Sequence, residues 1–512
     1  MATLHVFGAP SACQSTQTLA EQGLLVGSAP VSPVSSLFST SAVTLAENDT
    51  TRDETFTVTW DGPNDPENPK NWNAKQKWAT SLIISTFAFL SPLCSSITAP
   101  ALTSIGAEFH IPVGIQQQLV LSIFLLAYAI GPFVLAPCSE VWGRMPSQSQ
   151  ITAFRFLAGL GGSASVGMGS GVLNDCWKPE ERGRGFVAYQ LAPVLGPAIG
   201  PIVGGYMSQY TTWRWCFWVI VLANVVVQAV AFFFLRETYA PVLLQRRAQA
   251  LRASTGNPKL QTQWEQSGAD RTLPSLLRVA LSRPWVMLGT QPIVQLFALY
   301  QAFNYGTLWL LISSFPALFE GRYGMARGDA SLNYISLAAG LLVGVYICGP
   351  GVDWLYAHLK RRHGLGPDEP GLPEFRVPLM VPASVLLPCG ILLYGWAAEA
   401  RLHWIVPNLG AALFACCSMM TYQCSSTYLA DTYGLYTASS SAACACLRSL
   451  LAFVFPLFVP ALFGSLGYGG GGSVLALLAV VIGIPAPLVV WFFGARLRGA
   501  SKFAKKPVSE KV

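Results

Sequence analysis

The side chains of this sequence that could do chemistry inside an apolar environment are few, and two of them are arginines. Arg448 lies inside a long apolar stretch, and Arg155 lies near the beginning of another one. A guanidinium group is costly to bury in lipid, so Arg448 should face a cavity or a polar partner. Arg155 could do the same, or its long side chain could extend to the membrane interface. Arginines at these positions predict a site where a charged or polar partner is bound inside the membrane.

Catalysis and metal binding need clusters that the apolar stretches do not contain. An intramembrane enzyme would need His, Asp or Cys side chains grouped inside them, but none of the five histidines and no carboxylate lies well inside one. The twelve cysteines lack the spacing of metal ligands and are expected to be small buried hydrophobic residues. We therefore expect a protein that is not an enzyme and that binds no metal or other cofactor.

Polar and aromatic residues inside the apolar stretches are candidate ligand contacts. Gln301, Asn304 and Tyr305 share one helical face, which could line a cavity for bulky organic molecules or only form hydrogen bonds between helices. Without an intramembrane carboxylate a polycation would be poorly held, so neutral amphipathic or weakly acidic molecules are favoured. The cavity candidates are Gln190, Gln295, Tyr300, Asn304, Tyr305, Tyr422 and Gln423.

One apolar stretch, Leu191–Gly205, carries three prolines and four glycines. Each such proline would cost a soluble helix about 3 kcal/mol, whereas neighbouring helices can satisfy the freed backbone groups in a membrane. Three of the glycines fall four residues apart on one helical face, where a second helix can approach closely. The stretch could be a packing surface alone or the pivot of a moving helix. Its candidate residues are Gly196, Pro197, Gly200, Pro201, Gly204 and Gly205.

Membrane-spanning helices must position these residues. The sequence is 52% hydrophobic and 11% charged, with a mean hydropathy of +0.45, whereas ordinary globular proteins are about a quarter charged. The net charge of +7 comes from cations in loops between apolar runs. Cations placed there set membrane topology and do not indicate binding to nucleic acid. We expect an all-α polytopic membrane protein without a cleavable signal peptide.

Eleven apolar runs are near or above the about 20 residues needed to cross the hydrocarbon region. The expected spans are about 78–98, 119–139, 151–173, 186–206 and 215–235, then 286–314, 332–351, 377–396, 404–428, 438–464 and 474–493. The expected regions are a disordered cytoplasmic tail (1–77), an N-terminal helical bundle (78–235), a cytoplasmic central loop (236–284), a C-terminal helical bundle (285–494) and a cytoplasmic tail (495–512).

The basic residues of the first set of spans do not fit the number of spans. Arg144 follows the second span, and Lys178, Arg182 and Arg184 follow the third. Lysine and arginine collect on the cytoplasmic side, so both loops are expected on that side although only one span separates them. A single helix cannot cross the membrane and return to the same side.

Four stretches of the sequence resemble the major facilitator superfamily, and within it the fungal drug:proton antiporters. The run from Asp65 to Trp72 is similar to the segment before their first helix, and Gly131–Arg144 is similar to their cytoplasmic loop signature. Phe154–Ala164 resembles their fourth helix, and Leu191–Gly205 resembles the fifth-helix signature of exporters. The resemblance extends from about residue 60 to about residue 500.

The resemblance implies roles for several residues. Arg155 and Gly159 would belong to a helix that influences proton coupling. Glu140 and Arg144 would latch the cytoplasmic face of the bundles, although ordinary positive-inside anchoring is the alternative for that loop. Relatives carry another whole helix between the residues that match Arg144 and Arg155, whereas ten residues separate these two arginines here. The resemblance therefore implies twelve spans by descent, of which the third is missing.

The function implied by the resemblance is transport by alternating access between two helical bundles. The expected activity is proton-driven export of drugs, toxins or fungal secondary metabolites. Proton-coupled uptake, a non-transporting receptor and an inactive splice product are the alternatives. The expected partners are a small organic substrate, protons and the lipid bilayer, without nucleic acid. The chain is expected to be a monomer in the plasma membrane rather than the vacuole, and to use the proton gradient in place of a cofactor.

Overall fold

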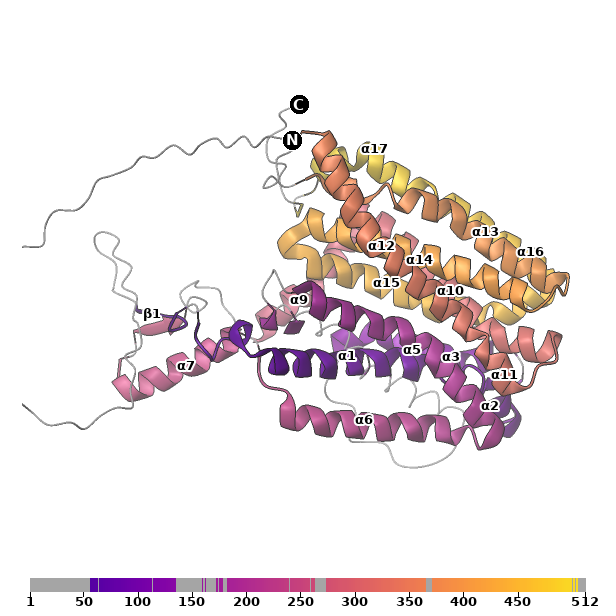
Figure 1. The fold of residues 1–512 in the computed structure, drawn as a ribbon, viewed down its shortest axis with the longest axis horizontal. Coiled ribbons are helices and arrows are strands. Elements are labelled where there is room, and N and C mark those ends of the chain that lie inside the picture. Colours follow the sequence, from indigo (N-terminus) through magenta and orange to yellow (C-terminus); the bar gives the residue numbers. More distant parts are fainter. Residues whose placement is uncertain are drawn as a thin grey trace, which may run out of the picture. The chain divides into compact units, whose positions relative to one another are not determined.

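The computed structural model describes residues 56–62, 64–112, 114–134, 159, 162, 172–173, 175–177, 182–238, 240–257, 259–262, 273–364, 371–499, 501 and 503–504. These residues are almost entirely helical (Figure 1). Nine of the described helices are long and apolar enough to cross a membrane. This confirms the expected all-α polytopic fold. The third expected span, 151–173, lies mostly outside the described residues.

The helices follow the order of the expected spans. The helices of the first half are α1 (Ala74–Ser96), α2 (Leu102–Glu108), α3 (Ile115–Val134), α5 (Arg182–Tyr210), α6 (Arg214–Phe234) and α7 (Ala240–Thr255). Those of the second half are α9 (Leu273–Thr290), α10 (Pro292–Pro316), α11 (Arg327–Leu332), α12 (Tyr334–Arg362), α13 (Met380–Glu399), α14 (Ile405–Tyr433), α15 (Thr437–Leu457), α16 (Val459–Gly483) and α17 (Pro485–Gly499). Short turns, η1 (Pro69–Asn71), η2 (Ala317–Arg322), η3 (Pro373–Arg376) and η4 (Gly434–Tyr436), lie between helices.

The first bundle is built around α1, which packs against α5 and α6. Hydroxyl groups inside α1 donate to carbonyl oxygens one turn earlier, as Ser81 does to Lys77 and Ser85 does to Ser81. These bonds satisfy the polar groups within the helix, as a membrane requires. The indole N–H of Trp177 also donates to the Ser81 hydroxyl at 2.9 Å, so the chain just before α5 packs against α1 as well.

Glycines let the helices of the second bundle approach one another closely. α14 packs against both α12 and α13, and α10 packs against α15. A methyl group added to Gly390 would lie 2.6 Å from the Phe414 nitrogen, and one added to Gly410 would lie 2.5 Å from the Tyr394 nitrogen. The backbones of α13 and α14 therefore meet at a distance that larger residues would not allow.

A turn at Gly467 divides α16 and separates the last two spans. Gly467 has a φ of 69°, a conformation that favours glycine. The carboxylate of Glu399 accepts hydrogen bonds from the N–H groups of Tyr468 and Gly469 at 2.7 and 3.3 Å. It thereby satisfies free donors at the start of the helix that follows. α15 and the residues up to this turn correspond to the expected span 438–464, and the residues after it correspond to the expected span 474–493.

The two bundles contact each other through two pairs of long helices. α3 packs against α15, and α5 packs against α12 and the short helix α11. Figure 1 shows α7 at one end of the bundles and α2 and α11 at the other. The first of these ends also carries the basic C-terminus of α12, with Lys360, Arg361 and Arg362, and we call it the basic end. By the positive-inside rule it is the expected cytoplasmic end.

A small unit of strand and helix lies at the basic end, before α1 and after α6. Strand β1 (Phe56–Val58) pairs in parallel with β2 (Leu260–Thr262), and α7 contacts both strands. The expectation of a disordered tail over 1–77 is therefore wrong for its last part, because residues 56–62 and 64–77 have defined structure. Strand pairing with the central loop orders this segment, and a three-residue strand gives little local signal in the sequence.

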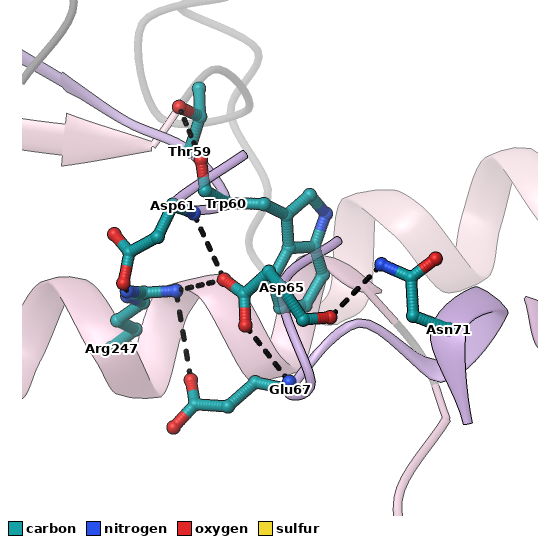
Figure 2. A network of polar contacts seen from close by, with 7 residues as sticks. All are labelled: Thr59, Trp60, Asp61, Asp65, Glu67, Asn71 and Arg247. Carbon is teal, nitrogen blue, oxygen red and sulfur yellow. Dashed lines mark hydrogen bonds and ion pairs between the residues drawn. The ribbon is translucent and has the colours of Figure 1, made fainter. Parts of the chain in front are cut away.

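Arg247 of α7 holds the segment before α1 through a cluster of acidic side chains (Figure 2). Its guanidinium forms ion pairs with Asp65 at 2.7 Å, with Glu67 at 3.6 Å and with Asp61. Burial raises the pKa of Asp65, but the N–H groups of Asp61 and Glu67 and the Arg247 charge outweigh burial, so the pKa is lowered from its ordinary value. The run resembling the family segment before the first helix is thus a folded, charge-paired connection.

Candidate functional site

Arg448 of α15 lies between two tyrosines from neighbouring helices. Its guanidinium carbon is 5.0 Å from the centroid of the Tyr305 ring in α10 and 5.1 Å from that of the Tyr422 ring in α14. All three side chains are half-buried. A cation over an aromatic face is attracted by the negative charge of the ring surface. Arg448 thus meets polarizable partners inside the membrane, in line with the cost of burying it elsewhere.

Buried amides continue this polar surface along α10 and α14. The Asn304 amide donates to the Thr421 hydroxyl at 3.1 Å, and the Gln301 amide donates to the Ser425 hydroxyl at 2.8 Å. The Asn304 carbonyl oxygen, although buried, has no hydrogen-bond partner among the described residues. We call these residues the polar strip, made of Gln301, Asn304, Tyr305, Thr421, Tyr422, Ser425 and Arg448.

The strip contains Asn304, Tyr305, Tyr422 and Arg448 from the sequence candidates, but it excludes two others. Tyr300 is packed in the interior of the second bundle, 1% exposed, and its hydroxyl shares a 2.7 Å hydrogen bond with Ser384. Gln295 is exposed, next to the exposed Leu299, and its amide donates to the Gly289 carbonyl oxygen.

The two remaining glutamine candidates, Gln423 and Gln190, are not part of the polar strip. Gln423 is half-buried in α14, beside Tyr422. Gln190 belongs to α5, but its side chain lies outside the part that the structure describes.

The sequence reasoning missed Thr421 and Ser425, which complete the strip. Their spacing of four residues places both on one face of α14, next to Tyr422, and this signal is visible in the sequence. It is weak because hydroxyl side chains in a membrane helix commonly bond to their own backbone. Thr421 and Ser425 do this as well, donating to the carbonyl oxygens of Ser418 and Tyr422 at 2.9 Å.

The glycines of α5 face two different partners. A methyl group on Gly196 would lie 2.8 Å from the Pro92 side chain, and methyl groups on Gly200 and Gly204 would overlap Ser96 and the Ile97 backbone. These three glycines therefore pack against α1, inside the first bundle. Gly205 instead meets Ser331 of α11, in the second bundle.

The two prolines of the same motif, Pro197 and Pro201, are buried. The hydroxyl of Ser96 in α1 reaches the Gly196 carbonyl oxygen at 3.4 Å. Neighbouring helices thus supply the environment that the prolines of α5 need.

Three candidates between the second expected span and the next one lie outside the described residues. These are Glu140 and Arg144, which end the second span, and Arg155, near the start of the next, so their expected roles in latching and proton coupling remain predictions. Gly159 is described and is buried in a helical conformation. Among the described residues, no group of three His, Cys, Asp or Glu side chains could hold a metal ion.

The polar strip has a defined chemical capacity. It offers one positive charge, two aromatic faces and an unpartnered amide oxygen on three helices of the second bundle. α15 packs against α3 of the first bundle, so Arg448, the one residue of the strip on α15, belongs to a helix at the boundary between bundles. Such a surface can bind a ring system and an acidic group of the same organic molecule.

Comparison with known proteins gives a consistent result at three levels. Residues 145–456 match the family model described as Major Facilitator Superfamily. The efflux pump vrtL of Penicillium aethiopicum is 42% identical over 467 residues, covering 87% of this chain and 91% of that one. The efflux pump radE of Floropilus chiversii is 35% identical over 469 residues, covering 88% and 86%.

A solved structure with the same fold is the xylose transporter XylE from E. coli, in a partially occluded inward open conformation. It has a TM-score of 0.56 and 13% sequence identity, and the match covers 82% of this chain and 98% of that chain. At this identity the likeness concerns the fold alone.

Proposed function

Because this chain belongs to the major facilitator superfamily, a family of membrane transporters, we propose that it exports small organic molecules by alternating access. Export would be driven by protons that flow inward, without a bound cofactor. The substrate would bind at the polar strip, between the two bundles. The chain would act as a monomer in the plasma membrane.

The observation that carries this proposal is the set of relatives described as efflux pumps. Two of them match this chain at 35% and 42% identity along nearly the whole length of each protein. Relatives of this kind support an exporter over an uptake permease.

The polar strip supports an organic substrate with an aromatic ring and an acidic group. Arg448 would attract the acid, and the Tyr305 and Tyr422 rings would stack on the apolar part of the substrate. The unpartnered Asn304 oxygen could accept a hydrogen bond from a hydroxyl group on the same molecule. Weakly acidic aromatic metabolites are therefore the favoured class.

Export can be tested in a yeast strain that lacks its own drug exporters. The chain, and a version with a third helix restored between Arg144 and Arg155, would be expressed and the cells loaded with a fluorescent aromatic acid. We expect the restored version to lower the accumulated fluorescence, and a protonophore to abolish the difference. Equal accumulation in cells with and without the restored version would contradict the proposal.

Direction and location need separate measurements. In inverted plasma-membrane vesicles, an exporter driven by protons should accumulate the acid when the lumen is made acidic. Accumulation in right-side-out vesicles with an acidic exterior would indicate uptake instead. Binding of the acid without flux in proteoliposomes would indicate a receptor. Fractionation of plasma membrane from vacuole would test the location.

A further inference from the structure

The end of the bundles opposite the basic end is closed by contacts between the two bundles. Arg327, the first residue of α11, donates hydrogen bonds to the hydroxyl groups of Ser104 and Thr103 in α2, the latter at 3.2 Å. The N–H of Gly328 donates to the side-chain oxygen of Gln209 near the end of α5. α2 and α5 belong to the first bundle and α11 to the second, so each of these bonds crosses the boundary.

The short helix α2 is fixed to the first bundle at both of its ends. The carboxylate of Glu108 accepts a hydrogen bond from the Trp213 indole at 2.7 Å and forms an ion pair with Arg214, at the start of α6. The Gln117 amide of α3 donates to the Leu102 carbonyl oxygen at 2.7 Å. α2 should therefore move together with the first bundle.

Arg327 is held just as clearly by its own bundle. Its Nε lies 3.4 Å from the Glu320 carboxylate in η2, and its carbonyl oxygen accepts a 2.8 Å hydrogen bond from the Ser331 hydroxyl. The Nε of Arg327 thus pairs within the second bundle, while its two terminal nitrogens donate to α2.

Gly205 makes the closest approach between the bundles at this end. A methyl group on Gly205 would overlap the Ser331 hydroxyl and lie 2.5 Å from the Ser331 Cβ and 3.2 Å from the Arg327 carbonyl oxygen. Rotation of the serine side chain could not relieve the Cβ contact. With serine at position 331, the two bundles can therefore close at this end only if residue 205 has no side chain.

The buried apolar core is continuous across the two bundles. It includes Leu102 and Ile105 of α2 and also Ala330 of α11 and Tyr334 of α12, all buried. Burial of these apolar side chains on both sides of the boundary favours the closed state, and the polar contacts of Arg327 and Gly328 add to it.

We propose that Arg327, Gly328 and Gly205 form an outer gate, which holds the bundles closed at the end away from the cytoplasm. To open this end, the bonds from Arg327 to α2 must be exchanged for water, while the Arg327–Glu320 pair and the Glu108–Arg214 pair stay within their own bundles. Arg327 is a positioning residue because it sets the balance between closed and open states. The gate depends on the proposed alternating access but on neither the substrate nor the direction of transport.

The gate can be tested by thiol labelling, which needs no transport. An Ala330→Cys variant places a thiol on α11 at a position that is 3% exposed. Intact cells would be treated with a membrane-impermeant maleimide, and the parent chain would give the background from native cysteines. Arg327→Ala in the Ala330→Cys protein should increase the labelling rate about tenfold, since it removes two hydrogen bonds from a charged donor.

Arg322→Ala is the matched control. Arg322 lies in η2 of the same connection, but its guanidinium bonds at 2.8 and 3.2 Å to Glu399, inside the second bundle. Its loss should leave the labelling rate of Ala330→Cys unchanged. An equal increase for Arg322→Ala would mean that the loop has only been loosened, and would overturn the gate.

A second pair of variants tests the close approach and does not depend on the arginine. Gly205→Ala should also increase labelling, and adding Ser331→Gly should return it to the rate of Ala330→Cys alone, because it removes both colliding atoms. Slow labelling of both Arg327→Ala and Gly205→Ala at normal surface levels would refute the gate. Failure of Ser331→Gly to restore slow labelling would also refute it. If the labelling rates of these variants differ as expected but the protein shows no export, the result would count against the proposed function and not against the gate.

Discussion

Asp65 and Arg247 are 182 positions apart in the sequence, yet their side chains form a 2.7 Å hydrogen-bonded ion pair. The Asp65 side chain is 3% exposed and that of Arg247 is 16% exposed, so the pair is screened less than a surface pair. Asp65 also accepts hydrogen bonds from the Asp61 and Glu67 N–H groups at 2.9 Å. Removing the guanidinium would leave a buried carboxylate with only backbone partners.

Arg247→Ala should therefore loosen the unit formed by β1, β2 and α7. We expect a loss of about 1–3 kcal/mol in the free energy of local opening, measured as faster hydrogen exchange of the amides in 56–72. Arg246→Ala is the control because Arg246 is the adjacent residue, carries the same charge and is exposed. Equal exchange rates in the two variants would contradict the role given to Arg247.

The lowered pKa of Asp65 sets the pH dependence of this unit. Its stabilisation is complete above the ordinary aspartate pKa of about 4 and is lost as the pH falls through the lower pKa of the folded state. Asp65→Asn has no charge to lose. Amide protection in the parent chain should exceed that of Asp65→Asn at pH 6, and the two should converge only as the pH falls from about 4 through the lowered pKa of the folded state. A difference that grows on acidification would contradict this assignment.

Arg448 should select acidic substrates. Arg448→Gln removes the charge, so export of an aromatic acid should fall about tenfold more than export of its neutral amide, because one charge-assisted contact is lost. The control is Arg283→Gln, since Arg283 also lies over a tyrosine, 5.4 Å from the Tyr436 ring centroid, but outside the polar strip. A uniform loss for acid and amide in Arg448→Gln would point to a structural role.

Sequence patterns located some of these residues and missed others for physical reasons. The cost of a buried guanidinium identified Arg448 as a residue that needs partners, and helical spacing identified Tyr305. The pattern placed Gln295 and Tyr300 in the cavity as well, since a polar or aromatic residue in a span can face lipid, the bundle interior or the pathway. The bond from Arg327 to Ser104 joins residues 223 positions apart, and no local pattern encodes it.

At the level of elements, apolar run length predicted the helices well because it reflects the thickness of the bilayer. The turn at Gly467 lies in the gap left between the last two expected spans. The strands β1 and β2 were not expected, because three residues give no usable alternation and their pairing depends on a partner about 200 residues away. The glycine spacing of α5 predicted a close helix contact but could not say which helix would make it.

The packing of α5 on α1 gives a prediction for this element. Gly204→Ala should reduce the yield of folded protein, because its methyl group would overlap the Ile97 carbonyl oxygen, which is backbone and cannot rotate away. The control is Gly464→Ala in α16, where nothing lies within 4 Å of the added methyl and where alanine improves helix propensity by about 1 kcal/mol. Yield would be measured by size-exclusion chromatography in detergent. A normal yield for Gly204→Ala would contradict the packing account.

At the scale of the whole molecule, charge and span count together constrain the topology. Basic residues at the end of α12 and in α7 lie at the same end of the bundles, as the positive-inside rule requires. The loops around Arg144 and Arg182 are both basic, so the same rule places both on the cytoplasmic side and requires a further span between them. The sequence alone predicts this conflict, because it follows from the number of spans and the positions of the basic loops. The segment concerned, residues 135–158, lies outside the described part of the chain. Sequencing the transcript across the codons for Met145 to Ile151 would show whether a helix is removed by splicing.

The pairing of β1 with β2 also determines where this polypeptide can be divided. Strand β2 pairs with β1, the strand before α1, and its last residue is Thr262. The next described helix, α9, begins at Leu273 and packs against α10 and α15 of the second bundle. A gene fission between these two residues would leave each fragment with its own set of neighbours, joined only by the surfaces they already share. Co-expressed fragments 1–262 and 273–512 should copurify. A break between Phe234 and Ala240 would instead separate α7 and β2 from β1, their partner in the first fragment, and should weaken the association.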